Sequence, residues 1–531
     1  MRYDFVGIRE FAEMLTREGG LASGRVLSNR KALEGARLHR HVQKKLTAEH
    51  ADFQAEKAAL YTVNREWLTD SDAAYLSSKS VDIASEPAGF MLEGRIDGVY
   101  TDNDTLVICE IKSGDEHPAS ASAAHFLQAA VYAFIESRDL PSDAKLRIDI
   151  IYGLYSDYDA LRVFSFAETP ESIAAIFRPY AFRYGRYVRF NIDHNARLSR
   201  QLDELPFLFD SFRDGQRRLS VNVFNTLNNS EGGTLLCKAP TGIGKTAGTL
   251  YPALKALRFA DGEKSAVFYF TARGEGARPP AEALKLAGSQ ATELRYCVLT
   301  AKDKICLNTT SGSEKNASRE FECKPEQCEA GKGHYDRVDA AIREALFSNA
   351  RCFDSRFVSE LARKHCVCPF ELMLDLSQFC DVIVCDYNYL FDPESYLRRY
   401  FEGKGGQYFF LIDEAHQLPD RVRSMYSATL DAHTFARLAK GKKRQRIGKS
   451  CVKTAQALEA LLCAPAPGDT FDEPAQLELF EQGTDPVSKV PARNDAASDG
   501  AAADETDSKT TFLVDKSLLR QLESFCDAAA E

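Results

Sequence analysis

The sequence predicts a multidomain α/β protein, and three observations support this fold class. At 531 residues the chain is too long for a single hydrophobic core. A glycine-rich loop near residue 240 stands between a strand-like and a helix-like segment, and a strand-like segment near residue 410 ends in two carboxylates. A hairpin-like segment lies near residue 100. Strands that alternate with helices form sheets covered by helices.

The composition argues against a membrane-spanning protein. Hydrophobic residues make up 44% and charged residues 27% of the chain, the proportions of a soluble globular protein. No apolar stretch approaches the ~20 residues that span a bilayer, and the N-terminal segment lacks the uninterrupted apolar core of a signal peptide. We therefore expect a cytoplasmic protein.

The net charge of −10 argues against a surface that binds polyanions everywhere, but it does not describe a local groove. Two local stretches are basic. Each is either a phosphate-contacting surface or a solvated helix face. The first contains Arg183, Tyr184, Arg186, Tyr187 and Arg189, and the second contains Lys440, Lys442, Lys443, Arg444, Arg446 and Lys449.

The first pattern that carries chemistry is a strand–turn–strand segment from Gly94 to Lys112. Asp97 ends the motif Gly-Arg-Ile-Asp, the turn Thr-Asp-Asn-Asp follows, and Glu110-Ile-Lys112 ends the second strand. Successive side chains of a strand point to opposite faces, so Glu110 and Lys112 share one face, and a hairpin folds Asp97 next to them. Two carboxylates in this arrangement hold Mg²⁺ or Mn²⁺, while the lysine orients a water or stabilises the pentavalent phosphate.

Residues on both sides of this hairpin extend the pattern. Gln128 and Tyr132 are four residues apart on a predicted helix, so they share a face. His39 follows Gly35 by four residues and is expected to complete the metal site, with His41 as the alternative.

This order of motifs resembles the RecB-like branch of the PD-(D/E)XK nucleases over roughly residues 30 to 135. The resemblance implies an α/β nuclease-like domain that acts on DNA, with His39, Asp97 and Glu110 as metal ligands. Lys112 is then a catalytic residue. Some relatives hold an iron–sulfur cluster in this domain, but only Cys109 is present here, so we expect none in it.

A phosphate loop follows, with the sequence Ala-Pro-Thr-Gly-Ile-Gly-Lys-Thr from Ala239 to Thr246. Residues 234–238 (TLLCK) are predicted to enter it as a strand, and a helix is predicted after it. Backbone N–H groups of such a loop bind phosphates, Lys245 reaches the β and γ phosphates, and the Thr246 hydroxyl binds Mg²⁺. Ala239 replaces the first glycine of the usual pattern. The residues expected to bind ATP in the loop are Thr241, Gly242, Gly244, Lys245 and Thr246.

An acidic box, Asp413-Glu414-Ala-His, follows residues 407–412 (QYFFLI), which are predicted to be a buried strand. At the carboxyl end of a parallel strand, Asp413 is placed to bind Mg²⁺ and Glu414 to orient the attacking water. The alternative is an acidic N-cap of the next helix.

The phosphate loop and the acidic box resemble those of the superfamily 2 helicases, and two further segments extend this resemblance. Arg213 and Gln216 match the Q motif of that family, which recognises adenine. Residues 268–273 (FYFTAR) resemble the strand and loop that touch the DNA backbone. The resemblance implies a RecA-like P-loop motor lobe that hydrolyses ATP.

Six of the fourteen cysteines fall within about sixty residues, which indicates a metal centre rather than scattered thiols. Cys306, Cys323, Cys328 and Cys368 have a spacing that suits zinc or an iron–sulfur cluster, with Cys366 as the alternative fourth ligand. The XPD/DinG-like helicases insert a [4Fe–4S] domain at this place in the motor, and their last ligand also precedes a proline and an aromatic residue. The resemblance therefore implies iron and favours Cys368. The other thiols of the region, Cys352, Cys380 and Cys385, are interpreted as buried or incidental.

Beyond Asp413 the sequence contains no Gln-x-x-Gly-Arg-x-x-Arg segment, the motif by which a second motor lobe reaches the bound ATP. We therefore expect that motor lobe 2 is absent and that the chain is C-terminally truncated. Residues from 426 are expected to begin a helical arch. Residues 464–510 are rich in Ala, Asp, Glu, Pro and Thr and are expected to form a disordered linker.

Within this linker, Gln476-Leu477-Glu-Leu479-Phe480 carries apolar side chains in a polar segment. Such exposed apolar clusters usually mark a docking peptide. The pattern resembles the pentapeptide by which bacterial replication and repair proteins bind the sliding clamp. The alternatives are a short amphipathic turn and chance.

The expected function is that of a 5′ to 3′ iron–sulfur DNA helicase in DNA repair or replication, with a metal-dependent nuclease domain. Its cofactors are ATP, Mg²⁺, a [4Fe–4S] cluster and Mn²⁺ or Mg²⁺ in the nuclease domain, and its partner is single-stranded or forked DNA. The alternatives are a nuclease with a regulatory nucleotide-binding half and a non-catalytic DNA-damage adaptor.

The expected domains are residues 1–200 (nuclease-like), 201–300 (first part of helicase lobe 1), 301–379 (iron–sulfur domain), 380–425 (DEAH part of lobe 1) and 426–531 (partial helical arch with the linker).

Overall fold

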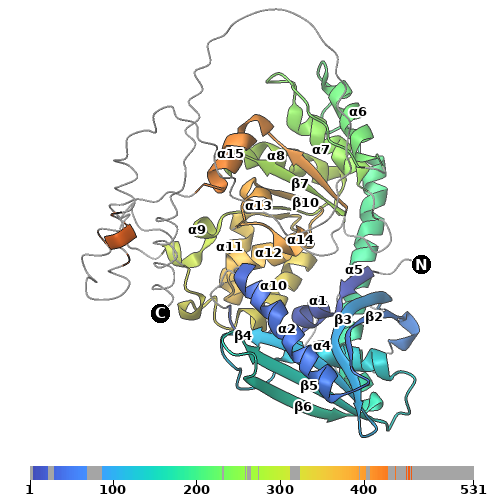
Figure 1. Cartoon of the computed structure of the whole chain (residues 1–531). Helices are drawn as coiled ribbons and strands as arrows, with labels where there is room; N and C mark the ends of the chain where they lie inside the picture. The colour runs from blue at the N-terminus through green and yellow to red at the C-terminus, as the bar shows by residue number, and fades with distance from the viewer. Residues whose placement is uncertain are drawn as a thin grey trace, which may run out of the picture. The chain divides into compact units, whose positions relative to one another are not determined.

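The structure is a computed structural model in which the chain divides into two compact units, Met1–Met425 and Tyr426–Glu531. The elements described below belong to the first unit (Figure 1). The expected linker, the basic run from Lys440 to Lys449 and the pentapeptide from Gln476 to Phe480 lie outside the described residues. The structure describes residues 4–21, 29–68, 87–229, 232–257, 259, 265–272, 274–310, 323–393, 395–401, 407–427, 437, 450, 452–454 and 456.

The N-terminal part of the first unit contains a six-stranded mixed sheet in the order β1-β3-β4-β5-β6, with β2 also paired to β3. β1 and β3 are parallel, as are β4 and β5, and the other pairs are antiparallel. The expected hairpin near residue 100 is confirmed as β3–β4. The sequence had indicated only this hairpin among helices, so the sheet is larger than predicted. The strands are β1 (Asp4–Gly7), β2 (Gln54–Val63), β3 (Phe90–Asp102), β4 (Thr105–Gly114), β5 (Lys145–Leu154) and β6 (Leu161–Glu168).

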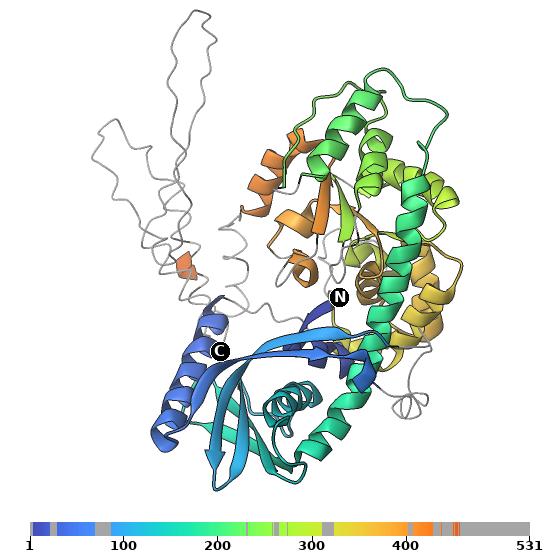
Figure 2. The ribbon, with the colours of Figure 1, turned by 90° about the vertical axis from the view of Figure 1, so that its right-hand side faces the viewer.

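Helices cover both faces of this sheet. α1 (Ile8–Leu15), α4 (Ala123–Ser137) and the first half of α5 (Pro170–Glu204) share the larger core with one face. On the other face, α2 (Asn29–Glu49) buries Leu38 and Val42 in a smaller core. Figure 2 shows α2 and α4 on opposite sides of the sheet.

The second sheet has five parallel strands in the order β11-β7-β10-β8-β9. Every residue of β7 is buried. One face packs against α7 and α8 and the other against α10, α11 and α12, the arrangement of a doubly wound α/β domain. The strands are β7 (Ser265–Thr271), β8 (Tyr296–Val298), β9 (Cys352–Phe353), β10 (Val382–Asp386) and β11 (Gln407–Ile412), and the helices are α6 (Gln216–Leu227), α7 (Lys245–Ala256), α8 (Arg278–Gln290), α9 (Lys302–Ile305), α10 (His334–Phe347), α11 (Ser355–His365), α12 (Pro369–Ser377), α13 (Asn388–Phe391), α14 (Arg398–Phe401) and α15 (Leu418–Met425).

The strand predicted at residues 234–238 was wrong. The structure assigns no strand there, and Leu236 is 87% exposed. A strand needs a ladder partner and one buried face, and among the described residues no strand pairs with this segment. The predicted helix after the loop and the strand at 407–412 are confirmed as α7 and β11. The prediction that this strand is buried was wrong, because β11 lies at the edge of the described sheet, where it pairs with β7 alone, and Phe410 is 42% exposed.

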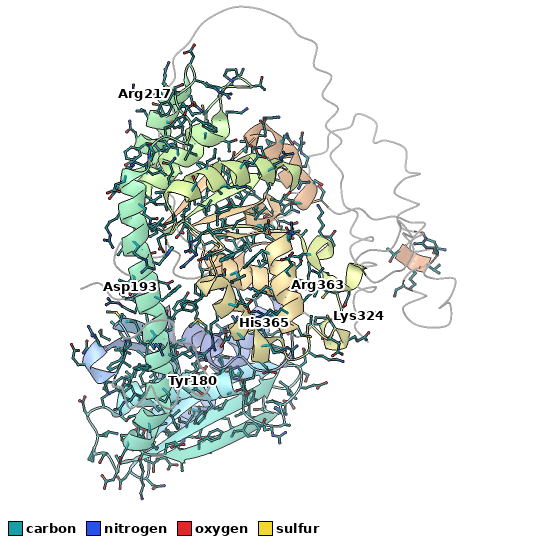
Figure 3. All side chains as sticks on the ribbon, turned by 180° about the vertical axis from the view of Figure 1, so that it is seen from behind. Tyr180, Asp193, Arg217, Lys324, Arg363 and His365 are labelled. Atoms are coloured by element: carbon teal, nitrogen blue, oxygen red, sulfur yellow. The ribbon has the colours of Figure 1, made fainter. Side chains whose placement is uncertain are left out.

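α5 is a single helix that continues through residue 200, where the sequence had placed a domain boundary. It begins at a capping box of Thr169 and Ser172. Its residues Ile173 to Val188 contribute to the N-terminal core, whereas Leu198 contributes to the core of the second sheet. Figure 3 labels Tyr180 and Asp193 along this helix.

In the part of the chain that the structure describes, no helix is both long and apolar enough to cross a membrane.

Candidate nuclease site and nucleotide site

The first candidate site lies where β3 and β4 separate. Their antiparallel pairing runs from Asp102 opposite Thr105 to Gly98 opposite Cys109. The next residues along the two strands are Asp97 and Glu110. The fork therefore places two carboxylates from different strands next to one another, as the hairpin predicted.

Asp97 is held from both sides. Its Oδ2 accepts a hydrogen bond from the backbone N–H of Ile111 at 2.7 Å, and its Oδ1 lies 3.5 Å from Nδ1 of His39 on α2. The amide of Gln43, one helical turn after His39, donates to the Asp97 carbonyl at 3.0 Å and to Oε1 of Glu56 at 2.9 Å. Glu56 has a φ of 52°, in the left-handed region. The sequence analysis missed Gln43, although its i,i+4 spacing from His39 was a signal for it.

Glu110 is the most buried acid of the site, at 2% exposure. Nζ of Lys112 lies 2.7 Å from Glu110 Oε1 and also donates to Oε1 of Gln128 at 3.2 Å. Glu110 Oε2 is buried and has no hydrogen-bond partner. Burial raises the pKa of Glu110 to about 7; the Asp97 carboxylate adds to this rise and Lys112 opposes it. A further cation beside Glu110 would lower this pKa and favour the charged carboxylate.

Tyr132 closes the site from α4. Its hydroxyl accepts a hydrogen bond from the backbone N–H of Arg95 at 3.3 Å. It lies 2.6 Å from the position that a Cβ at Gly94 would occupy, so position 94 requires glycine. Burial raises the pKa of Tyr132 to about 12, so the phenol stays protonated at neutral pH. His41 instead has its Nε2 2.9 Å from Oδ1 of Asp159, which places His39 rather than His41 at the site.

The donor set fits a divalent metal in its chemistry. Carboxylate oxygens and one imidazole suit Mg²⁺ or Mn²⁺, and Glu110 Oε2 is an available buried ligand atom. The ammonium of Lys112 neutralises the other oxygen of the same carboxylate. Among the described residues, no three His, Cys, Asp or Glu side chains are gathered closely enough to form a complete metal-binding group.

The second candidate site lies at the carboxyl end of the parallel sheet. Gly242 and Gly244 have φ values of 85° and 81°, and α7 begins at Lys245. Nζ of Lys245 lies 3.2 Å from Oε1 of Glu414. The backbone N–H of Asp413 donates to the Phe270 carbonyl at 3.0 Å, which holds the acidic box beside β7.

Two tyrosines support the acidic box. The Tyr387 hydroxyl donates to the Asp413 carbonyl. Tyr269 interacts with Thr246 and Asp413, and burial raises its pKa. Tyr269 therefore lies near the two side chains expected to bind Mg²⁺. The sequence analysis did not single out Tyr269.

The structure places Gln216 and Arg213 against the phosphate loop. Gln216 is 2% exposed; its Nε2 donates to the Gly244 carbonyl at 2.9 Å, and its Oε1 accepts from the backbone N–H of Arg213 at 3.0 Å. The Arg213 guanidinium donates to the Gly242 carbonyl. Both residues thus hold the loop in place through hydrogen bonds. Their contact with adenine stays a prediction. Thr241 lies in the exposed turn of the loop, and Arg273 lies outside the described residues.

The four cysteines expected to bind a cluster lie on three segments: Cys306 follows α9, Cys323 and Cys328 flank a short 3-10 helix (Pro325–Gln327), and Cys368 precedes α12. Lys302 interacts with Cys323 and Cys368. Burial lowers the pKa of Lys302, but Cys323, Glu371 and Cys368 raise it by more, so the pKa is raised overall. Cys328 Sγ accepts a hydrogen bond from Asn308 Nδ2 at 3.2 Å. Burial raises the pKa of the Cys368 thiol to about 11. Figure 3 labels Lys324, Arg363 and His365 in this part of the chain.

The remaining thiols of this region differ in their surroundings. Cys366 is exposed, has a φ of 53°, and places its Sγ 3.7 Å from the Glu329 carbonyl. Cys380 and Cys385 are buried, as expected, and Cys352 is half-buried. Cys306 is half-buried at the end of α9.

Two family models match different parts of the chain. The PD-(D/E)XK nuclease superfamily matches residues 11–171, and the DEAD_2 family matches residues 281–435. The first includes β3, β4 and α4, and the second includes β11 and the acidic box.

Curated relatives match over part of their length. The regulator of telomere elongation helicase 1 homolog of Anopheles gambiae is 28% identical over 145 residues, 27% of this chain and 14% of the relative. The human regulator of telomere elongation helicase 1 is 27% identical over 143 residues, 27% of this chain and 12% of the relative. The general transcription and DNA repair factor IIH helicase subunit XPD of Schizosaccharomyces pombe is 23% identical over 260 residues, 45% of this chain and 33% of the relative. The matches thus span one third or less of these relatives.

Among solved structures, an XPD helicase is 21% identical with a TM-score of 0.31, over 47% of this chain and 41% of that chain. A truncated XPD is 20% identical with a TM-score of 0.31, over 46% of this chain and 64% of that chain. The two family matches thus identify a PD-(D/E)XK nuclease-superfamily segment at residues 11–171, followed by a DEAD_2 segment at residues 281–435.

Proposed function

We propose that the protein is an ATP-dependent DNA helicase of the iron–sulfur type with a metal-dependent DNA nuclease domain. The observation that carries the proposal is the 3.2 Å contact between Lys245 of the phosphate loop and Glu414 of the acidic box. Glu414 lies inside the segment that matches the DEAD_2 family, residues 281–435, and Lys245 precedes that segment. The relatives named above support DNA as the substrate and a role in DNA repair or replication. Movement is proposed to be 5′ to 3′ along a single strand.

In the proposed motor, ATP replaces the partner of Lys245. The ammonium of Lys245 lies 3.2 Å from Oε1 of Glu414. The β and γ phosphates of ATP are stronger partners for this ammonium, because they carry more charge and the loop N–H groups also bind them. Glu414 is then released to orient the attacking water. Thr246 and Asp413 would hold Mg²⁺.

In the proposed nuclease, His39, Asp97 and Glu110 would hold Mg²⁺ or Mn²⁺, which supplies an activated water and neutralises the phosphate. Lys112 is placed beside Glu110 to stabilise the charge that develops on the phosphate. Gln128 holds the Lys112 ammonium in position.

Cys306, Cys323, Cys328 and Cys368 would hold the [4Fe–4S] cluster. Their thiolates are suitable ligands, and Lys302, which interacts with Cys323 and Cys368, supplies a cation in this region. The cluster's proposed role is to stabilise a wedge over the DNA path.

ATP hydrolysis separates this proposal from its alternatives. A protein that includes motor lobe 2 should hydrolyse ATP in a reaction stimulated by single-stranded DNA, and the 531-residue chain alone should bind ATP with much slower turnover. Glu414→Gln should abolish hydrolysis while retaining binding of a fluorescent ATP analogue, and Lys245→Ala should lose both. ATP binding without DNA-stimulated hydrolysis would favour a nuclease with a regulatory nucleotide-binding half. DNA binding with neither hydrolysis nor cleavage would favour a non-catalytic DNA-damage adaptor.

A sliding clamp is proposed as a further partner through Gln476, Leu477, Leu479 and Phe480. Three apolar side chains contribute roughly 1.5–3 kcal/mol each before ordering costs, enough for micromolar affinity. A labelled peptide of residues 472–484 should bind a bacterial clamp, and the double substitution Leu479→Ala with Phe480→Ala should abolish binding. No binding near ~100 µM peptide would remove the proposal.

A further inference from the structure

We propose that Arg9, in the first turn of α1, binds a backbone phosphate of the nucleic-acid strand next to the carboxylate–lysine site. This inference rests on the proposed nuclease function, because it names the residue that would hold the strand there. Arg9 was not among the residues that the sequence motifs indicated.

The pairing of β1 with β3 brings α1 to the site. The two strands are parallel up to Gly7, which lies opposite Glu93, and α1 begins at the next residue, Ile8. A Cβ at Gly94 would lie 3.2 Å from Ile8 Cδ1 and 2.6 Å from the Tyr132 hydroxyl. The first turn of α1 is therefore beside Tyr132, and Arg9 directly follows Ile8.

The Arg9 guanidinium is near enough to the site for Glu110 and Tyr132 to affect its pKa. Glu13 makes the largest contribution to the raised pKa of Arg9, and Glu110 and Tyr132 add to it. On the same side of the site, burial lowers the pKa of His125 to about 4, with contributions from Lys112 and Arg9. His125 is therefore neutral at pH 7, so it supplies no positive charge for a phosphate.

Arg9 is more available to a ligand than Lys112. The Lys112 ammonium has two partners, Glu110 at 2.7 Å and Gln128 at 3.2 Å, and is 18% exposed. Arg9 is 72% exposed, and its Nε donates to Oε1 of Glu13, a pair at i,i+4 spacing, at 2.7 Å. Exposed ion pairs of this kind contribute little to stability, so a phosphate can replace Glu13 at low cost.

The chemistry of the ligand follows from these charges. A strand that enters the site meets Asp97 and Glu110, which repel phosphate unless a metal neutralises them. A neighbouring phosphate then needs its own cation, and the planar guanidinium of arginine binds two phosphate oxygens at once. The ligand class is a phosphodiester backbone, recognised without regard to base sequence.

The test uses the full chain with Ca²⁺ and thymidine 3′,5′-bisphosphate, a probe with two phosphates. Calorimetric titration should show about tenfold weaker binding for Arg9→Ala and an intermediate affinity for Arg9→Lys, which keeps the charge but loses the bidentate geometry. Arg138→Ala is the matched control, because Arg138 lies beyond the far end of α4 and stacks on Tyr61. It should bind the probe as the wild type does. The buried face of α1 is unchanged in these variants, so their melting temperatures should match that of the wild type.

A second measurement separates this inference from the nuclease proposal itself. If the protein cleaves single-stranded DNA with Mn²⁺, Arg9→Ala should raise KM by about tenfold and leave kcat nearly unchanged. An unchanged KM, or a loss of kcat alone, would show that Arg9 does not bind the strand. If the wild type cleaves nothing but binds the probe through Arg9, the phosphate site stands and the nuclease proposal falls. Probe affinity equal in the wild type and Arg9→Ala, or no binding by the wild type at millimolar probe, would overturn the phosphate site.

Discussion

At the scale of single residues, Lys112 tests the proposed nuclease chemistry most directly. Lys112→Ala should reduce Mn²⁺-dependent degradation of single-stranded DNA by about 10²-fold or more, because it removes the cation beside the reacting phosphate. The assay follows a labelled oligonucleotide, with Arg138→Ala as the control that keeps full activity. Equal cleavage by the wild type and Lys112→Ala would contradict the assignment.

Gln216 makes a different residue-scale prediction, since its buried amide joins Gly244 to Arg213. Gln216→Ala removes both hydrogen bonds of this amide, and the Gly244 carbonyl keeps only the N–H of Gly248 as a donor. We therefore expect weaker binding of a fluorescent ATP analogue and a loss of about 1–3 kcal/mol in the free energy of unfolding. The exposed Gln290, replaced by alanine, is the control. Unchanged ATP affinity in Gln216→Ala would show that the loop keeps its shape without this brace.

At the scale of elements, the β3–β4 hairpin shows which local sequence signals were sufficient to predict a pair of strands. Its turn residues Asn103 and Asp104 both have positive φ, at 46° and 64°, which asparagine and aspartate tolerate better than most residues. The strands on either side carry the apolar residues, and in β4 the run from Val107 to Ile111 is buried throughout. Because turn and pattern agree, the hairpin was predictable without knowledge of the rest of the fold.

α5 provides a stability prediction at the same scale, because Gly185 lies where the helix meets residues 68 and 88. A Cβ at Gly185 would lie 2.8 Å from the Ala88 carbonyl oxygen and 3.0 Å from Leu68 Cδ1. Gly185→Ala should therefore destabilise the protein by about 1–3 kcal/mol, despite the higher helix propensity of alanine.

Gly288 in α8 is the matched control for this substitution. Nothing lies within 4 Å of a Cβ built there. Gly288→Ala should raise the free energy of unfolding by up to about 1 kcal/mol, because alanine loses less backbone entropy in a helix. Chemical denaturation of both variants checks the prediction, and changes of the same sign would contradict it.

At the scale of the whole molecule, the metal content decides whether the cysteine-bearing segment holds iron. Protein purified without oxygen should be brown and contain about four irons per chain, and Cys328→Ser should lose the colour and DNA binding. Cys352→Ser, at a thiol outside the proposed ligand set, should keep the iron. Stoichiometric zinc without iron would establish a structural zinc site instead.

The sequence by itself determined the features that depend on neighbouring residues. The helix after the phosphate loop, the strand that precedes Asp413 and the face shared by Gln128 and Tyr132 all follow from local spacing, and the structure contains each of them. The order of the motifs was also enough to predict a nuclease-like domain ahead of a helicase segment, which the two family matches confirm.

Only the tertiary structure decided which residues meet across long distances in the chain. It placed His39 rather than His41 beside Asp97, turned Gln216 onto the phosphate loop, and brought the start of α1 beside Gly94 of β3. It also left residues 234–238 outside the sheet, although their sequence resembles a strand. The physical reason is the same in each case, because a local pattern specifies which face a side chain occupies but not what packs against that face. That choice depends on burial and on hydrogen bonds between segments far apart in sequence, which form only when the whole domain folds.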